Sequence, residues 1–319
     1  MLVIKRNKMV KIDVVVVTYN RLEKLKKTLS CYEIQGQFIR NLVVVNNHST
    51  DGTDEFLAEW KKSCSGYNKV VLNLVDNIGG AGGFYEGQKW SISQKPDWIL
   101  LADDDAYANG DLLERFIDYL EKHDTQDVSS ICTAVYKTDA SIDFGHRKWL
   151  KFDCGINPKF VCSRHEDYDK EHFNIDLFSY VGTFLKREAL ESAGLGNPDF
   201  FIYYDDSEHS IRMKMQGKIV CVPSLKYIHD DGAGLAKIDE TTYLTWRDYY
   251  GIRNKIYVLL RYYPIPGCFW ALSRVVKCYT KFLFIKECRK LYLAAIVDGI
   301  RGILGRHSLY KPGFSIKKK

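Results

Sequence analysis

The sequence has little of what marks a secreted, membrane-spanning or dinucleotide-binding protein. Its nine cysteines form no CxxC pair and no metal-finger spacing, so we expect reduced thiols in a cytosolic compartment rather than a disulfide framework. No apolar run approaches the about 18 to 20 residues that cross a bilayer. Lysines interrupt residues 1–12, which argues against a signal peptide. The chain also lacks the GxGxxG and P-loop patterns, which argues against the nucleotide sites that those motifs make.

Positive charge is concentrated in the C-terminal part of the chain. The net charge of the 319 residues is +6, but residues 243–319 hold sixteen Lys and Arg against three Asp and Glu. These cations alternate with Trp, Phe and Leu, which predicts basic amphipathic helices. Such helices suit an anionic membrane surface, but packing against the rest of the chain explains the pattern equally well. We expect a domain over residues 1–242 and a helical region over 243–319, and no nucleic-acid partner because no recognition motif is present.

Strand and helix patterns alternate through the first 122 residues. Apolar, β-branched runs predict buried strands, and segments with helical spacing follow them, which is the order of βαβ units. The pattern therefore predicts an α/β fold with a mostly parallel sheet flanked by helices. Residues 140–176 are irregular, residues 177–185 predict another strand, and the chain from residue 243 is predicted to be helical. The expected early strands are residues 13–20, 42–45, 70–75 and 98–102, and the expected early helices are residues 21–32, 54–62, 84–93 and one from residue 112.

Three consecutive carboxylates, Asp103, Asp104 and Asp105, follow the buried strand expected over residues 98–102. In open α/β sheets, ligands bind at the carboxyl ends of the strands. Like charges gathered there favour a compensating cation, and carboxylate oxygens suit Mg²⁺ or Mn²⁺. A polar loop whose acids cap the next helix is the competing interpretation.

A glycine-rich segment, residues 77–84, lies between an expected strand and an expected helix. Glycines there would let a phosphate approach the backbone N–H groups at the helix N-terminus. The alternative is a tight turn that needs glycine only for its backbone angles.

A second acidic cluster, Asp205, Asp206 and Glu208, follows four aromatic residues and one isoleucine at residues 200–204. A carboxylate in a partly apolar pocket can have its pKa raised toward the range of a general base. Asp205 or Ser207 could equally cap the following helix. His229, which follows an apolar run, is either a structural hydrogen-bonding group or a metal ligand beside Asp105.

Aromatic and cationic side chains also recur over residues 246–254. Arg247, Tyr250, Arg253 and Asn254 fall within two helical turns, and such groups can line a sugar or pyrophosphate pocket. An ordinary amphipathic helix face gives the same spacing, and spacing alone favours that reading.

Together these motifs resemble family 2 glycosyltransferases with the GT-A fold. Residues 17–21 and 45–53 are similar to that family's two nucleotide-binding turns, residues 103–105 to its DxD element, and residues 205–208 to its catalytic acidic motif. The glycine-rich segment, the Asp-Asp-x-Glu form of the acidic motif, His229 and residues 250–254 resemble the branch of bacterial galactofuranosyltransferases and rhamnosyltransferases. The likeness covers about residues 12–260.

The resemblance implies a role for each motif. Thr18 and Asn47 would hold a uracil or thymine base, Asp105 and His229 would bind Mn²⁺ or Mg²⁺, and Asp206 would be the catalytic base that deprotonates the acceptor hydroxyl. The other donor-binding residues would be Tyr19, Asn20, Asn77, Gly79, Gly80, Asp103 and Asp104. The acceptor or donor-sugar pocket would include Gly82, Gly83, Phe84, Tyr204, Asp205, Glu208, Trp246, Tyr250 and Arg253.

The implied activity is metal-dependent transfer of a sugar, with inversion, from a UDP- or dTDP-sugar to a lipid-linked oligosaccharide. Galactofuranose is the favoured sugar, and rhamnose from dTDP-rhamnose is the alternative. The enzyme would act in bacterial cell-surface polysaccharide synthesis, in the cytoplasm and attached to the inner-membrane surface, either alone or as a homo-oligomer. Two alternative functions belong to other classes of protein: a sugar nucleotidyltransferase and a non-catalytic nucleotide-sugar-binding module.

Overall fold

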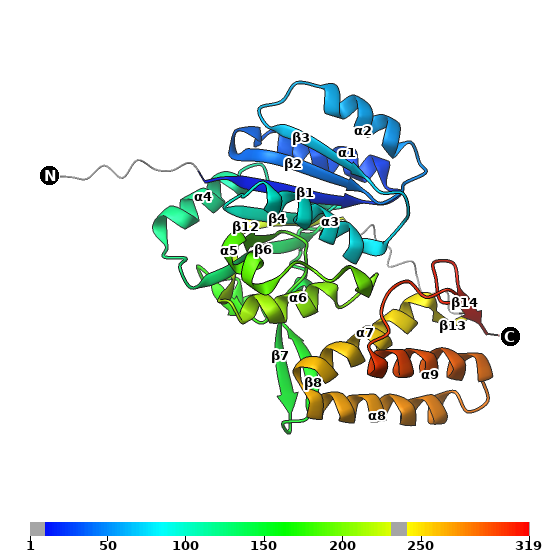
Figure 1. Cartoon of the computed structure of the whole chain (residues 1–319). Coiled ribbons are helices and arrows are strands. Elements are labelled where there is room, and N and C mark those ends of the chain that lie inside the picture. The colour runs from blue at the N-terminus through cyan, green and yellow to red at the C-terminus, as the bar shows by residue number, and fades with distance from the viewer. Residues whose placement is uncertain (1–9, 231–240, 319) are drawn as a thin grey trace.

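A computed structural model describes residues 10–230 and 241–318 of the chain. A nine-stranded mixed sheet lies at the centre of the described part, and helices flank it (Figure 1). Strand β1 pairs in parallel with β2 and β4, β2 with β3, and β6 with β12, whereas β11 runs antiparallel between β4 and β6. The order is β3 (Asn68–Asn73), β2 (Ile39–Asn46), β1 (Ile12–Thr18), β4 (Trp98–Asp103), β11 (Thr183–Lys186), β6 (Val128–Lys137), β12 (Lys218–His229) and β5 (Ala106–Ala108), and β9 (Phe173–Ile175) pairs with β12.

The central strands are buried on both faces because alternate side chains point to opposite sides of the sheet. Val14 and Val16 of β1 pack with helices α1, α2 and α4 in one core. Val15 and Val17 pack with α3, α5 and α6 in the other. The predicted α/β architecture is therefore confirmed. These helices are α1 (Leu22–Glu33), α2 (Thr53–Lys62), α3 (Gly79–Ser93), α4 (Leu112–Lys122), α5 (Arg187–Ala193) and α6 (Asp205–Lys214).

Some local predictions were wrong. The glycine-rich segment is not a turn before a helix, because helix α3 begins at Gly79. Residues 177–185 do not form one strand: β10 (Leu177–Phe178) and β11 are separate, since Gly182 adopts a φ of 64° between them. The irregular region contains the hairpin of β7 (Arg147–Asp153) and β8 (Asn157–Cys162), which with β10 makes a second sheet.

The C-terminal region is helical, as predicted, and has a core of its own. Its helices α7 (Trp246–Tyr262), α8 (Pro264–Lys281) and α9 (Lys286–Arg301) enclose apolar side chains such as Ile256, Ala271 and Leu291. A two-stranded sheet that was not predicted, β13 (Thr242–Thr245) with β14 (Ser315–Lys317), closes the region. Among the described helices, none combines the length and the apolarity needed to cross a membrane.

Candidate active site

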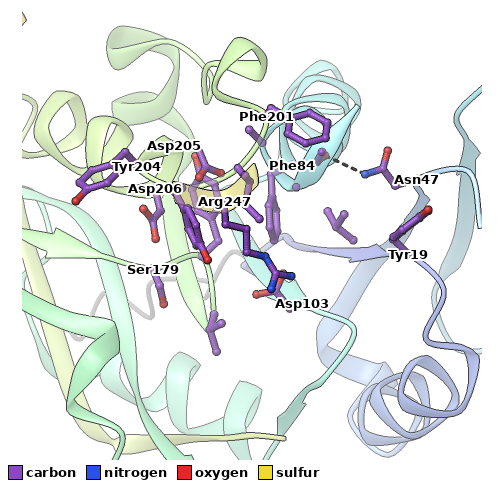
Figure 2. Close-up of a pocket in the computed structure, with 18 of the residues that line it drawn as sticks. Tyr19, Asn47, Phe84, Asp103, Ser179, Phe201, Tyr204, Asp205, Asp206 and Arg247 are labelled. Carbon is purple, nitrogen blue, oxygen red and sulfur yellow. Dashed lines mark hydrogen bonds between the residues drawn. The ribbon is translucent and has the colours of Figure 1, made fainter. Parts of the chain in front are cut away.

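One cavity of about 770 Å³ opens where the parallel strands end and the C-terminal region meets the sheet. The two acidic clusters reach it from different elements, with Asp103 at the end of β4 and Asp205 and Asp206 at the start of α6. Figure 2 shows Asp205 and Asp206 on the side opposite Tyr19 and Asn47, with Asp103 between them. Fourteen of the residues to which the resemblance assigns a role line this cavity: Thr18, Tyr19, Asn47, Asn77, Gly79, Gly80, Phe84, Asp103, Asp104, Tyr204, Asp205, Asp206, His229 and Trp246.

Asn47 ties the ends of β1 and β2 to the start of α3. Its Nδ2 donates to the carbonyl oxygen of Gly79 at 2.9 Å, and its Oδ1 accepts from the backbone N–H of Ile78 at 3.0 Å. Gly79 has a φ of 80°, and a Cβ there would lie 2.0 Å from the carbonyl oxygen of Phe201, so no other residue fits. The amide of Asn47 therefore fixes the wall of the cavity.

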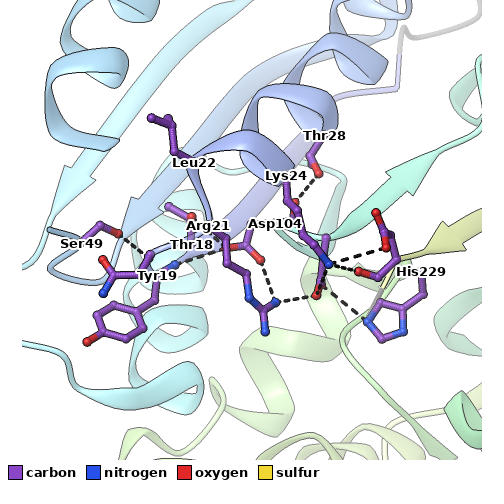
Figure 3. Close-up of polar contacts among 12 residues, drawn as sticks. Thr18, Tyr19, Arg21, Leu22, Lys24, Thr28, Ser49, Asp104 and His229 are labelled. Atoms are coloured by element: carbon purple, nitrogen blue, oxygen red, sulfur yellow. Dashed lines mark hydrogen bonds and ion pairs between the residues drawn. The ribbon is translucent and has the colours of Figure 1, made fainter. Parts of the chain in front are cut away.

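Basic side chains surround the first acidic cluster (Figure 3). The guanidinium of Arg21 donates from Nη1 to Asp104 Oδ1 at 3.1 Å and to Asp105 Oδ2 at 2.5 Å. Thr18 Oγ1 donates to Asp104 Oδ2 at 2.8 Å. Nε2 of His229 lies 3.5 Å from Oδ1 of Asp105. The cluster is thus part of a network that joins the ends of β1, β4 and β12.

The pKa values of the three aspartates do not all shift in the same direction, because their partners differ. Burial, followed by the charges of Asp105 and Asp104, raises the pKa of Asp103 to about 7. Burial also raises the pKa of Asp104 to about 6, against the opposing effect of Arg21. Burial acts in the same direction on Asp105, but His229 and Arg21 outweigh it and hold the pKa of Asp105 below its ordinary value.

Asp103, Asp105 and His229 carry ligand types that Mn²⁺ and Mg²⁺ accept. Among the described residues, these three do not form a group whose ligand atoms all lie within 4.8 Å of one another, and Arg21 already pairs with Asp105. His229 forms such a group with Asp143 and His146. Asp105 itself is buried just behind the cavity wall and is not among the lining residues.

A strained turn presents the second acidic cluster. Phe201, Tyr203 and Tyr204 have φ angles of 66–67°, a region that bulky residues rarely occupy. Nδ2 of Asn254 holds the turn by donating to the carbonyl oxygens of Ile202 at 2.8 Å and Tyr203 at 2.9 Å. Helix α7 therefore fixes the start of α6, where the carboxylates enter the cavity.

Asp205 and Asp206 have different neighbours. Burial, followed by the charge of Asp206, raises the pKa of Asp205 to about 8, which favours its neutral form at pH 7. Burial also raises the pKa of Asp206, but Lys148 and the N–H and O–H of Ser207 favour its ionised form. Asp206 is the member of the pair that can accept a proton.

We expect Asp205→Asn to stabilise the protein. A raised carboxyl pKa means that the folded state binds more protons than the unfolded state between pH 4 and pH 8, so stability falls as pH rises through this window. Asparagine removes that dependence. Because the carboxyl faces a hydrated cavity, we expect a gain on the order of 2 kcal/mol at pH 8 and little change at pH 4. Urea unfolding at both pH values measures this difference, and an equal gain at both would contradict the assignment.

Several of the singled-out residues lie outside the cavity and support its walls. Oδ1 of Asn20 accepts from the backbone N–H of Thr50 at 2.7 Å, which joins the two predicted nucleotide-binding turns. The others are buried or close-packed: Gly82 against Ile78, Gly83 against Val17, Glu208 in an ion pair with Arg212, Tyr250 beside Phe201, and Arg253 donating to the carbonyl oxygens of Phe200 and Gly305.

The cavity also contains residues to which the sequence assigned no role. Arg21 is the last residue of segment 17–21, which resembles a nucleotide-binding turn. Its cationic side chain at that position was the one sequence feature that could have indicated a place in the cavity. His146, Lys148 and Ser179 line the cavity from or beside the β7–β8 sheet, and Nδ1 of His146 lies 2.7 Å from Oγ of Ser179. His146 and Lys148 lie in the irregular segment 140–176, and Ser179 lies in an apolar run that predicted only a strand, so none of the three could be assigned to the site from the sequence.

Comparison with models of known protein families identifies the family of this chain. Residues 13–194 match the model of glycosyl transferase family 2. The chain belongs to this family. Family 2 membership makes the protein a glycosyltransferase.

Two curated glycosyltransferases are similar in sequence. The chain is 24% identical over 306 residues to the dTDP-rhamnosyl transferase RfbF of Shigella flexneri, a match that covers 91% of this chain and 96% of that protein. It is 33% identical over 116 residues to the galactofuranosyltransferase GlfT1 of Mycobacterium tuberculosis, a match that covers 36% of this chain and 37% of that protein. The resemblance to the rhamnosyl- and galactofuranosyltransferase branch is therefore confirmed.

Solved glycosyltransferases share the fold at low identity. GalNAc-T7, crystallised with UDP, GalNAc and Mn²⁺, has a TM-score of 0.61 and 14% identity over 93% of this chain and 57% of its own. The mannosyltransferase PcManGT from Pyrobaculum calidifontis, crystallised with GDP-Man and Mn²⁺, has a TM-score of 0.53 and 15% identity over 91% of this chain and 86% of its own. These likenesses confirm the GT-A fold.

Proposed function

We propose that this glycosyltransferase moves a sugar, with inversion, from a nucleotide-diphosphate donor to a lipid-linked glycan in bacterial cell-surface polysaccharide synthesis. The observation that carries the proposal is the shared cavity. It is lined by Thr18, Asn47 and Asp103 on the donor side and by Asp206 on the other. A donor and an acceptor hydroxyl bound in one cavity can react directly, without a covalent enzyme intermediate.

Asp206 is the proposed base of this reaction. Its carboxylate takes the proton of the acceptor hydroxyl while the hydroxyl oxygen attacks the anomeric carbon and the diphosphate leaves. Lys148 and Ser207 favour the ionised form of Asp206, and neutral Asp205 beside it adds no competing negative charge. A single base suffices because the reaction is one displacement, and that displacement inverts the anomeric centre.

Asp103, Asp105 and His229 are the proposed ligands of Mn²⁺ or Mg²⁺. The ion would supply positive charge to the departing diphosphate. Arg21 and Thr18 orient the neighbouring carboxylates through the hydrogen bonds described above. The network thereby holds the ligand side chains in place before the donor binds.

The two curated relatives point to two donor sugars. The higher identity to GlfT1 over 116 residues supports galactofuranose, which we take as the first candidate. The nearly full-length match to RfbF supports rhamnose from dTDP-rhamnose as the second. Both donors present a uracil or thymine base to the wall formed by Thr18 and Asn47.

Donor hydrolysis decides between these candidates. With Mn²⁺ present, we expect slow release of UDP from UDP-galactofuranose, or of dTDP from dTDP-rhamnose, and a loss of release when EDTA is added. A coupled assay that detects nucleoside diphosphate over a panel of nucleotide sugars measures it. Release of pyrophosphate from a nucleoside triphosphate, with no hydrolysis of any nucleotide sugar, would contradict the proposal and support a nucleotidyltransferase.

The acceptor side of the proposal concerns the basic C-terminal region. Residues 1–242 would form the catalytic domain, and residues 243–319 would attach it to the inner face of the cell membrane, where a lipid-linked acceptor lies. The excess of cations after residue 242 supports this attachment.

A further inference from the structure

Helix α8 has two contrasting faces. Ala271 and Cys278 are buried against the neighbouring helices, and Phe282, just past the helix end, packs into the same core. Six apolar side chains on the outer side are each at least 50% exposed. They follow one another at intervals of four and three residues, so the first five form one stripe along the helix and Leu283 continues it just past the helix end. This stripe, the outer face of α8, consists of Ile265, Phe269, Leu272, Val276, Tyr279 and Leu283.

The outer face of α8 is an unusual surface for a protein in water. Helix α8 contains no Asp or Glu, and Phe284, directly after Leu283, is 93% exposed. Scattered apolar residues are normal at a protein surface, but a continuous stripe of large ones marks a place of contact with another apolar body.

Cationic side chains gather on another side of α8, around Trp270. Arg274 and Lys255 both lie 4.7 Å from the ring centre of Trp270, and Lys277 and Lys281 follow on α8. Within residues 10–230 and 241–318, none of these four forms an ion pair with a carboxylate. Burial and Arg274 lower the pKa of Lys255 to about 8, and burial, Arg274 and Lys281 lower the pKa of Lys277. The cations repel one another, and an anionic surface would relieve the repulsion.

We propose that the outer face of α8 inserts into the surface of an anionic lipid bilayer, while Arg274, Lys277 and Lys281 on the polar side of the helix are attracted to the lipid phosphates. This assignment deepens the membrane attachment proposed above and rests on it. A second copy of the chain fits the face less well. A two-fold interface brings the same patch of both copies together, and a second α8, which contains no Asp or Glu, offers the cations no anionic partner.

The same arrangement brings the cavity close to the bilayer. Helix α8 lies against β8, and the β7–β8 hairpin reaches from the sheet to α8 at the edge of the molecule (Figure 1). Phe160 of β8 lines the cavity, and Lys255 lies 5.1 Å from its ring centre and 4.7 Å from that of Trp270. A path of contacts therefore leads from the cavity to Trp270 of α8, the helix that would lie on the membrane.

Vesicle sedimentation tests the assignment. We expect the wild-type protein to bind vesicles of phosphatidylglycerol and phosphatidylcholine, and the triple variant Phe269→Ser, Leu272→Ser, Val276→Ser to bind at least about tenfold more weakly. The variant Arg274→Gln, Lys277→Gln, Lys281→Gln should lose most of the preference for phosphatidylglycerol, because each cation near the surface contributes about 1 kcal/mol. The matched control is Ile300→Ser with Ile303→Ser, two exposed apolar positions off the stripe, which should bind as the wild type does.

Donor hydrolysis by the same variants separates the possible failures. Unchanged hydrolysis by the triple serine variant shows that the fold and the donor site are intact, so lost binding then belongs to the face. Wild-type affinity in this variant would overturn the role of α8 and leave membrane attachment standing. A wild-type protein that binds no vesicle would overturn both proposals. A dimer in sedimentation velocity that the serine variant abolishes would assign the face to a second copy and overturn membrane insertion.

Discussion

Asp206→Asn will lower sugar transfer by about 10³-fold or more while nucleotide binding survives. The amide keeps the size and the hydrogen-bonding position of the carboxylate, but it cannot accept the proton of the acceptor hydroxyl. General-base catalysis commonly contributes about 10² to 10⁴ in rate. Asp206 lines the same cavity as Asp103, yet the proposed donor-binding residues lie on other elements, so the substitution leaves them in place. Transfer rates and calorimetric titration with nucleoside diphosphate measure the two effects separately.

Glu208→Gln is the matched control for Asp206→Asn. Glu208 lies further along α6, pairs with Arg212 at 2.8 Å and is outside the cavity lining. Loss of the Glu208 carboxylate should lower the stability of the folded protein, because it removes the ion pair with Arg212, and should leave most of the rate of sugar transfer unchanged. An equal loss of activity in both variants, or an active Asp206→Asn enzyme, would remove Asp206 from its role as the base.

Asp105→Ala will weaken nucleotide binding in the presence of Mn²⁺ by about 100-fold and leave metal-free binding nearly unchanged. The variant removes a carboxylate that lies 3.5 Å from His229 Nε2, and the loss of a metal-site residue costs about one to two orders of magnitude in affinity or more. Calorimetry with and without Mn²⁺ measures the difference. Equal affinities for the variant and the wild type would exclude Asp105 as a ligand.

A second variant locates the ion beside His229. Asp143→Asn changes the neighbouring group of Asp143, His146 and His229 and leaves Asp105 in place. We expect nearly unchanged Mn²⁺-dependent binding, because Asp143 pairs with His146 at 3.5 Å rather than with the Asp105 network. Loss of binding in Asp143→Asn, with binding retained in Asp105→Ala, would move the ion to the other group.

The sequence was informative where local pattern and tertiary structure agree. Strands β1, β2 and β4 are buried on both faces, so their apolar runs were unmistakable, and the polar residues after each run had to meet at one sheet edge. The resemblance to family 2 glycosyltransferases assigned donor-binding roles to Thr18, Asn47 and Asp103, and all three line the cavity.

Long-range contacts explain what the sequence could not reveal. The turn at residues 201–204 is held in its strained form by Asn254, which lies about fifty residues further along the chain. Arg147 is fully buried, and its hydrogen bonds go to carbonyl oxygens such as those of Thr133 and Val181 and to hydroxyl groups rather than to a carboxylate. Neither the contacts of Asn254 nor those of Arg147 follow from a local sequence pattern. The sequence therefore could not predict the backbone shape that these two side chains stabilise.

The glycine-rich segment shows how tertiary packing can change the meaning of a motif. Its composition predicted a loop that lets phosphate approach the backbone. In the structure α3 begins there instead, and the absence of a side chain at Gly83 lets the helix approach Val17, where a Cβ would lie 2.6 Å from Cγ1. Gly83 thus serves the packing of α3 on β1, whereas Gly79 and Gly80 line the cavity at the start of the helix.

The anomeric configuration of the first sugar released from the donor tests the central claim most directly. In the proposed mechanism, the acceptor hydroxyl displaces the nucleoside diphosphate in one step, with Asp206 as the only base. Water can take the place of the acceptor hydroxyl. Proton NMR of the earliest hydrolysis product, with Mn²⁺ and the accepted nucleotide sugar, should therefore show the configuration opposite to that of the donor. A product that keeps the donor's configuration would contradict single displacement and the role of Asp206.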